Sequence, residues 1–178
     1  MRSAPALFLF TTILLTMSAV AQDPAAVSAA ESACGPSDVK LEVRNDNSQH
    51  TVAQPETGKA LVYVIQDIGS VNCIAGCITT RIASDGAWVG ANHHNSYFSF
   101  AVDPGEHHLC ANWQSRFGRL SQIVGVAHLT AEAGRVYYFR TRVLGATSTN
   151  FFDIEPIDSD QGRLFVASIP LSVSHPKK

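Results

Sequence analysis

Residues 79–90 read TTRIASDGAWVG and residues 97–113 read YFSFAVDPGEHHLCANW, and these two stretches decide the fold class. In each of them, short runs of β-branched, aromatic or alternating apolar residues flank a turn signal. Asp85-Gly86 accepts the positive φ angles of a type I′ hairpin turn. Asp103-Pro104-Gly105-Glu106 places proline and glycine where a type II turn needs them. The sequence therefore predicts two antiparallel β-hairpins in this part of the chain.

Alternation within residues 97–113 also predicts which side chains face the core. If Asp103 and Glu106 close the turn, strand periodicity places on one face Phe98, Phe100, Val102, His107, Leu109, Ala111 and Trp113. The opposite face then carries Tyr97, Ser99, Ala101, His108, Cys110 and Asn112. Because the first face is the more apolar one, we expect it to be the core face.

Strand and turn signals continue on both sides of this region. Residues 60–65 form a continuous β-branched and aromatic run suited to a central strand. Residues 126–131 and 136–143 flank Glu132-Ala133-Gly134-Arg135, which predicts a further hairpin, and residues 151–157 are a further expected strand. Short strands at close spacing are typical of an all-β protein, so we expect a single antiparallel β-sandwich.

The expected divisions of the chain follow from these signals. They are a signal peptide (1–21), a loosely ordered N-terminal arm (22–56), a β-sandwich domain (57–170) and a C-terminal tail (171–178). Within the arm, the alternation at residues 39–43 predicts one edge strand. Asp158-Ser159-Asp160 is interpreted as a turn or a helix cap, and the pattern of residues 159–168 fits a strand as well as a short helix.

The first 21 residues have the features of a signal peptide. Arg2 precedes an apolar run over residues 4–17, and Ala19 and Ala21 occupy the small-x-small positions of a cleavage site. We expect cleavage after Ala21, no stable membrane span afterwards, and an exported, periplasmic or secreted protein. The formal net charge of −2 provides no electrostatic attraction for nucleic acid.

An exported chain meets an oxidising compartment, in which an even number of cysteines favours disulfides. The chain has 4 cysteines, and the predicted pairs are Cys34 with Cys110 and Cys73 with Cys77. Cys110 is expected on the outer face of its strand, where the N-terminal segment can reach it. Only three residues separate Cys73 from Cys77. The alternative in which Cys34 joins the Cys73–Cys77 loop stays open.

The 7 histidines raise the question of a metal site. Adjacent residues on a strand point to opposite faces, so neither His93-His94 nor His107-His108 supplies two ligands to one ion. We expect no metal site and no cofactor, with one arrangement left open, in which His108 meets His128 from a neighbouring strand. Hydrolase, metalloprotease and phosphate-loop motifs are absent from the sequence, so we expect no catalytic residue.

Five sequence pieces together resemble a bacterial family of exported proteins, the domain-of-unknown-function family numbered 2846. They are Gly58-Lys59-Ala60-Leu61-Val62-Tyr63-Val64, Asp85-Gly86-Ala87-Trp88-Val89-Gly90, Ser96-Tyr97-Phe98, Asp103-Pro104-Gly105-Glu106-His107 and Glu132-Ala133-Gly134-Arg135-Val136-Tyr137-Tyr138. The resemblance covers roughly residues 56–145 and implies a transthyretin-like or immunoglobulin-like sandwich, with no known activity and no catalytic residue. Many relatives look like lipoproteins, whereas this chain lacks the lipid-attachment cysteine.

The sequence favours a non-enzymatic exported module that binds a partner or has a structural role in the cell envelope. The partner is unknown; another envelope protein or a glycan fits, and nucleic acid does not. Exported sandwiches can use strand aromatics to stack on sugar rings, and the candidates here are Trp88, Tyr97 and Tyr138. The alternative hypothesis is a carbohydrate-acting or metal-dependent periplasmic enzyme that uses the histidines.

Overall fold

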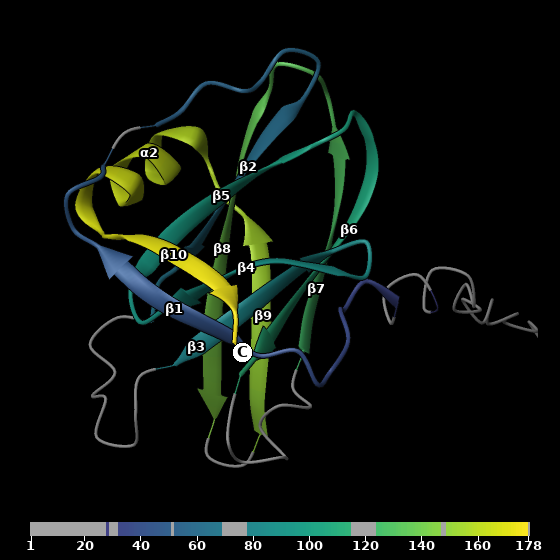
Figure 1. The fold of residues 1–178 in the computed structure, drawn as a ribbon, viewed down its shortest axis with the longest axis vertical. Coiled ribbons are helices and arrows are strands. Elements are labelled where there is room, and N and C mark those ends of the chain that lie inside the picture. Colours follow the sequence, from purple (N-terminus) through teal and green to yellow (C-terminus); the bar gives the residue numbers. More distant parts are fainter. Residues whose placement is uncertain are drawn as a thin grey trace, which may run out of the picture.

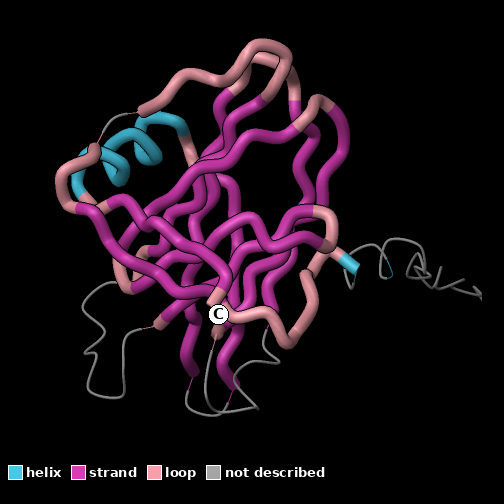
Figure 2. The backbone as a smooth tube through the Cα atoms, in the orientation of Figure 1, coloured by secondary structure: helices cyan, strands magenta, loops and turns pink. Residues whose placement is uncertain are grey.

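Strands dominate the structure, a computed structural model that describes residue 28 and residues 32–50, 52–68, 78–114, 124–146 and 149–177 (Figures 1 and 2). The N-terminal half of the fold contains β1 (Leu41–Asp46), β2 (Ala60–Gln66), β3 (Thr79–Ser84), β4 (Ala87–His93) and β5 (Ser96–Val102). The C-terminal half contains β6 (Gly105–Trp113), β7 (Val124–Ala131), β8 (Val136–Ala146), β9 (Thr149–Pro156), helix α2 (Ser159–Ser168) and β10 (Leu171–Pro176).

The strands form two sheets that pack face to face. One sheet has six strands in the order β1-β10-β5-β2-β8-β9, and the other has four in the order β4-β3-β6-β7. Most pairings are antiparallel; β2–β8 and β10–β5 are parallel. The core between the sheets is built from Ala60, Val62, Val64, Ile82, Phe98, Val102, Leu109, Ala111, Leu129, Ala131, Phe139, Phe152 and Ile154. The predicted all-β sandwich is confirmed.

The β3–β4 hairpin has the predicted turn. Ser84 pairs with Ala87, so the loop contains only Asp85 and Gly86. Their φ angles are 52° and 82°, both positive as a type I′ turn requires. Local sequence was sufficient here because the dipeptide itself sets the turn geometry.

The other two predicted hairpins are wrong. β5 belongs to the six-stranded sheet and pairs with β2, whereas β6 belongs to the four-stranded sheet between β3 and β7. Residues 103 and 104 therefore carry the chain from one sheet to the other, and residues 132–135 do the same between β7 and β8. The predicted inner face of residues 97–113 is nevertheless confirmed for Phe98, Val102, Leu109 and Ala111, which face one another across the core.

The sandwich extends beyond both predicted boundaries. β1 lies in the expected arm and is the edge strand that the 39–43 alternation predicts. It pairs along its whole length with β10, which occupies the expected C-terminal tail. Their pairing, Leu41 with Pro176 through Asp46 with Leu171, joins two segments about 130 residues apart in sequence. Short polar strands of this kind are stabilised by tertiary pairing rather than by local propensity.

The four-stranded sheet is closed at both edges. At the β4 edge, the backbone N–H groups of Ala91 and His93 donate to the hydroxyls of Ser174 and Ser172 on β10, at 3.1 and 3.3 Å. At the β7 edge, a Cβ added to Gly125 would lie 2.8 Å from the backbone oxygen of Phe152 on β9. These contacts protect strand edges that would otherwise be open to intermolecular pairing.

Helix α2 covers the outer face of the six-stranded sheet (Figure 1). Asp158 is its N-cap, as the cap interpretation predicts, and its Oδ1 accepts from the Asp160 N–H at 2.7 Å. Gly162 allows close packing, because a Cβ there would lie 2.3 Å from the Tyr138 ring. The apolar cluster between the helix and the sheet contains Leu61, Tyr63, Ile65, Tyr97, Tyr138 and, from the helix itself, Val166.

Candidate functional site

The N-terminal arm crosses the outer face of the four-stranded sheet and is covalently attached to it. Cys34 and Cys110 form the predicted disulfide. Trp88 packs against Gly35, and its Nε1 donates to the Pro36 carbonyl at 2.8 Å. The second predicted pair, Cys73 with Cys77, lies outside the described residues.

Arg81 is a buried cation beneath this arm. It is 4% exposed, and it donates to the Val39 carbonyl and to Oδ1 of Asn112. Its guanidinium carbon lies 4.1 Å from the centroid of the Trp88 ring, which is a cation–π contact. Burial lowers the pKa of Arg81, but an arginine stays protonated at any ordinary pH. Arg81 therefore holds the arm against the sheet, and its guanidinium is not accessible to solutes.

The three residues proposed for ligand stacking are occupied by internal contacts. Tyr97 and Tyr138 are 2% and 4% exposed. The Tyr138 ring stacks on Tyr63 with centroids 5.2 Å apart, and the Tyr97 hydroxyl donates to the Gln49 carbonyl at 3.1 Å. Trp88 is half-buried and contacts the arm. Tyr97 and Tyr138 are closed to a ligand, because the second apolar layer under α2 buries strand residues that alternation alone places on an outer face.

Asp85 and His107 form a short acid–imidazole contact that sequence reasoning missed. His107 Nδ1 lies 2.6 Å from Asp85 Oδ2, and His107 Nε2 lies 2.8 Å from the Asp103 carbonyl oxygen. The other carboxylate oxygen of Asp85 accepts from the His108 N–H at 2.8 Å. This contact links the β3–β4 turn to the β5–β6 connection, and it could not be foreseen because the predicted hairpins placed the two turns independently.

The electrostatics of this pair are set by competing effects. Burial by itself lowers the pKa of His107, but the hydrogen bonds to Asp85 and to the Asp103 carbonyl outweigh it and raise that pKa above 6.5. Burial raises the pKa of Asp85, and the hydrogen bonds from His107, the His108 N–H and Ser84 outweigh it, so the net pKa is below 3.8. Each group therefore stabilises the charged form of the other.

A pH-dependent contribution to stability follows from these two directions. The raised His107 pKa stabilises the fold fully below about pH 6.5 and loses its effect as pH rises through the folded-state value; the Asp85 contribution is lost as pH falls below about 3.8. We expect the stability difference between the wild type and His107→Gln to be largest between these limits and to shrink at pH 8.5, measured by urea unfolding.

Asp85→Asn is the matched control for this pH dependence. Asparagine keeps the hydrogen-bonding shape and tolerates the positive φ at this position, but it removes the charge. Replacing His107 in the Asp85→Asn background should give a flatter pH profile. A difference that instead grows with rising pH would contradict the interpretation.

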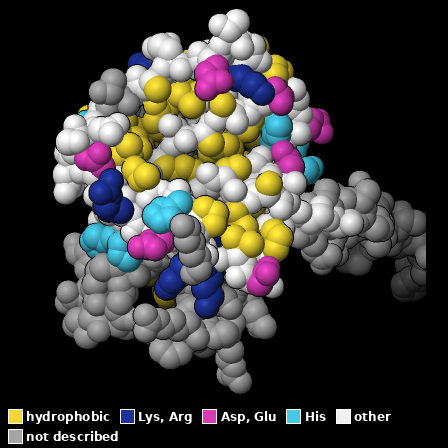
Figure 3. Space-filling model, in the orientation of Figure 1, with side chains coloured by type: hydrophobic (Ala, Val, Ile, Leu, Met, Phe, Trp, Pro, Cys, Tyr) yellow, Lys and Arg dark blue, Asp and Glu magenta, His cyan; other side chains and the backbone are white. Residues whose placement is uncertain are grey.

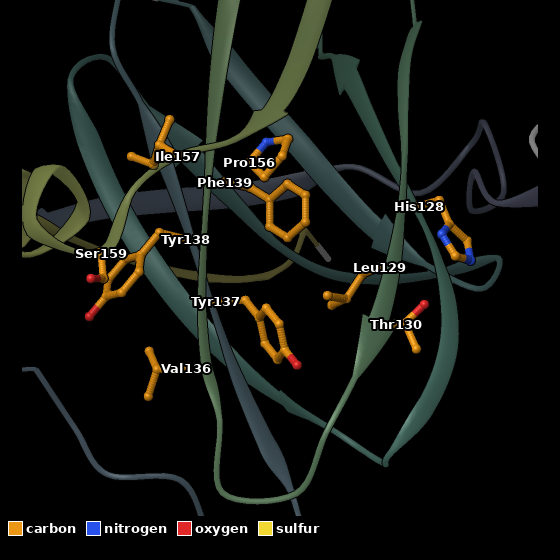
Figure 4. A pocket seen from close by; sticks show the side chains of 10 residues that line it. All are labelled: His128, Leu129, Thr130, Val136, Tyr137, Tyr138, Phe139, Pro156, Ile157 and Ser159. Atoms are coloured by element: carbon orange, nitrogen blue, oxygen red, sulfur yellow. The ribbon is translucent and has the colours of Figure 1, made fainter.

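A pocket of about 320 Å³ opens between β7, β8 and the β9–α2 connection (Figure 4). Its described lining is His128, Leu129, Thr130, Val136, Tyr137, Tyr138, Phe139, Pro156, Ile157 and Ser159, most of it apolar and without a carboxylate. Figure 4 shows Leu129 and Tyr137 directed into the space between β7 and β8, whereas the His128 ring is directed away from Tyr137. The Tyr137 hydroxyl accepts from the Glu132 N–H at 3.0 Å. The pocket surface therefore combines apolar and polar groups, and no described carboxylate lines it.

A network of ion pairs also lies on the outer face of the six-stranded sheet. Glu155 Oε1 on β9 lies 2.6 Å from Arg140 Nη2 and 2.7 Å from Arg142 Nη2 on β8. The hydrogen bond from Arg140 lowers the pKa of Glu155. Arg142 also approaches Asp153, and Arg140 approaches Asp67, at 3.6 and 3.8 Å. Because these charges neutralise one another across paired strands, they stabilise the pairing of β8 with β9. The register of that pairing could not be read from the sequence.

Two histidines meet directly on the outer face of the four-stranded sheet. His108 on β6 pairs in register with His128 on β7, the arrangement left open by the sequence, and their ring centroids are 5.4 Å apart. Glu106 Oε2 lies 3.7 Å from His128 Nε2. As strand alternation predicts, His107 faces the opposite way, toward Asp85. Across the described ranges, no three His, Cys, Asp or Glu side chains are arranged to hold a metal ion.

On the face drawn in Figure 3, acidic, basic and histidine residues lie in small mixed groups rather than in one charged area. Within the part of the chain that the structure describes, no helix is long and apolar enough to span a membrane.

The chain matches no family model. Comparison with curated proteins finds no match either. The same is true of solved structures, so the geometry described above is the basis for any functional assignment.

Proposed function

We propose that this protein is an exported β-sandwich module of the cell envelope, which binds a partner or has a structural role and does not catalyse a reaction. Export is supported by the signal-peptide features of residues 1–21 and by the Cys34–Cys110 disulfide, a bond typical of oxidising compartments. Another envelope protein or a glycan is the proposed kind of partner. Membership of the exported family numbered 2846 is part of the same proposal.

The proposal that the protein does not catalyse a reaction rests on the hydrogen-bond partners of His107. An ionised carboxylate and a peptide carbonyl only accept hydrogen bonds. Because Nδ1 faces Asp85 Oδ2 and Nε2 faces the Asp103 carbonyl, both imidazole nitrogens are occupied by acceptors of the protein itself. A general base needs an unprotonated nitrogen directed at its substrate. The acid–histidine contact thus favours a structural link over a catalytic pair, and the pocket has no described carboxylate to serve as an acid or base.

Export is tested by expressing the full chain in a bacterium with a C-terminal tag and separating periplasm, cytoplasm and membranes. We expect the protein in the periplasmic fraction or the medium, starting at Gln22; removal of 21 of the 178 residues leaves 157. Intact-mass measurement before and after thiol alkylation should show the Cys34–Cys110 bond. Full-length protein in the cytoplasm with four free thiols would overturn the export proposal.

The non-enzymatic part is tested on the purified oxidised protein. We expect no turnover of chromogenic glycoside, ester, phosphoester and peptide substrates, with or without added Zn²⁺. His107→Gln and His128→Ala are the comparison variants. An activity of the wild type that either substitution abolishes, while the variant stays folded by circular dichroism, would favour the periplasmic-enzyme alternative.

A further inference from the structure

We propose that His108 and His128 together bind one transition-metal ion of the Zn²⁺ or Cu²⁺ class on the outer face of the four-stranded sheet. The proposal goes beyond the function above and does not depend on it. Neutral imidazole is a preferred ligand of both ions. The two rings come from adjacent strands, β6 and β7, and are directly opposite in the β-ladder.

Ring separation matches the requirement of a shared ion. Zinc–nitrogen bonds of about 2.0–2.1 Å at a tetrahedral angle place the centroids of two bound imidazoles roughly 5–6 Å apart. The observed centroid distance is 5.4 Å, with 54° between the ring planes. The ring separation is therefore that of two imidazoles sharing one ion.

The backbone beneath the pair is held in place. Asp85 Oδ1 accepts from the His108 N–H, and Cys110, two residues further along β6 on the same face, is bonded to Cys34. Pairing of β6 with β7 continues on both sides of His108 and His128, from Gly105–Ala131 to Asn112–Val124. Ligands on a rigid sheet lose little conformational entropy on binding, which favours chelation by both imidazoles over binding to either one.

Glu106 is an acidic neighbour of this pair. It lies two residues before His108 and therefore on the same face of β6. Its Oε2 is 3.7 Å from His128 Nε2, and its side chain is 74% exposed. That separation is the distance of an ion pair, so the carboxylate favours a cation near the imidazoles by its charge and is not counted as a third ligand.

The chain contains a matched control at the edge of the six-stranded sheet. His175 on β10 pairs with Glu42 on β1, and His175 Nε2 lies 3.8 Å from Glu42 Oε2. This pair has the same imidazole–carboxylate contact and similar exposure, at 64% for each side chain, but only one histidine. Comparing the two pairs separates chelation by two imidazoles from binding to any exposed histidine beside an acid.

The experiment titrates Zn²⁺ and Cu²⁺ separately into purified oxidised protein by isothermal titration calorimetry. The protein carries no polyhistidine tag, and thiol assay first establishes that no free cysteine competes. We expect one equivalent per chain. His108→Ala and His128→Ala should each weaken the affinity at least tenfold, Glu106→Gln by a few-fold, and His175→Ala not at all.

Independent readouts distinguish loss of the ligand from loss of the fold. Each variant is melted without metal, and the four exposed or half-exposed substitutions should leave the melting temperature nearly unchanged. Added Zn²⁺ should then raise the melting temperature fully for the wild type and His175→Ala, slightly less for Glu106→Gln, and least for the two alanine variants at His108 and His128, because an ion bound to the native state alone stabilises that state. Electron paramagnetic resonance of the Cu²⁺ complex should show two nitrogen ligands, and one nitrogen in either alanine variant.

Equal affinity in the wild type and in both single alanine variants would overturn the proposal, as would the absence of binding at millimolar metal. Loss of binding in His175→Ala instead would place the ion elsewhere and would equally overturn it. None of these outcomes bears on export, which is measured separately by fractionation.

Discussion

Replacing Cys34 and Cys110 together by alanine should lower the free energy of unfolding by about 4 kcal/mol. The bond joins residues 76 positions apart and so removes much of the conformational entropy of the unfolded chain. Arg81 and Trp88 still hold the arm in the folded protein through Val39 and Pro36. The loss therefore arises mainly in the unfolded state. Urea unfolding followed by tryptophan fluorescence measures it.

The Cys73→Ala/Cys77→Ala double variant is the control for this experiment. Only three residues lie between those cysteines, so the same loop-entropy relation gives about 2 kcal/mol for a bond between them. We expect the Cys34/Cys110 variant to have the lower unfolding midpoint of the two. Equal midpoints for the wild type and the Cys34/Cys110 variant would show that the arm disulfide contributes nothing to stability.

Leu109→Ala should lower the free energy of unfolding by about 2–5 kcal/mol. Leu109 lies on β6, is 0% exposed and packs in the core between the sheets. Truncation removes buried methyl and methylene groups and leaves a cavity that strands fixed on both sides of β6 fill only in part. Urea unfolding of the purified oxidised protein gives the value.

Leu164→Ala is the matched control, because it deletes the same atoms from a side chain that is 67% exposed on α2. Its effect should stay within about 0.5 kcal/mol, since surface changes of this kind are small and alanine favours a helix. A large loss at Leu164 together with a small one at Leu109 would contradict the inward orientation of β6.

Features set by neighbouring residues were predictable. The Asp85-Gly86 turn depends on two residues that accept positive φ, and both adopt it. The N-cap at Asp158 is likewise a local contact, with the N–H two residues ahead. The inward face of residues 97–113 follows from strand periodicity, which holds whichever strands are neighbours. Pairing of Cys34 with Cys110 was inferred correctly from position alone.

Features that join distant segments were not predictable in the same way. Residues 103–106 carry turn-forming residues that serve a hairpin or a crossing between sheets, and burial of both inner faces decides for the crossing. β10 is a short segment at the end of the chain, LSVSHP, and its place near the edge of the sheet depends on pairing with β1 along its whole length. The Asp85–His107 contact and the burial of Tyr97 and Tyr138 under α2 depend on the same long-range arrangement.

The all-β class, one hairpin, the inner face of the central strands and the disulfide that anchors the arm were thus predictable from the residues alone. Which strands are neighbours emerged only in the folded protein, and with it the ion pairs, the pocket and the meeting of His108 with His128. This division arises because side-chain alternation specifies faces but not partners. Partners are chosen by the burial of whole faces and the closure of strand edges, to which residues far apart in the chain contribute together.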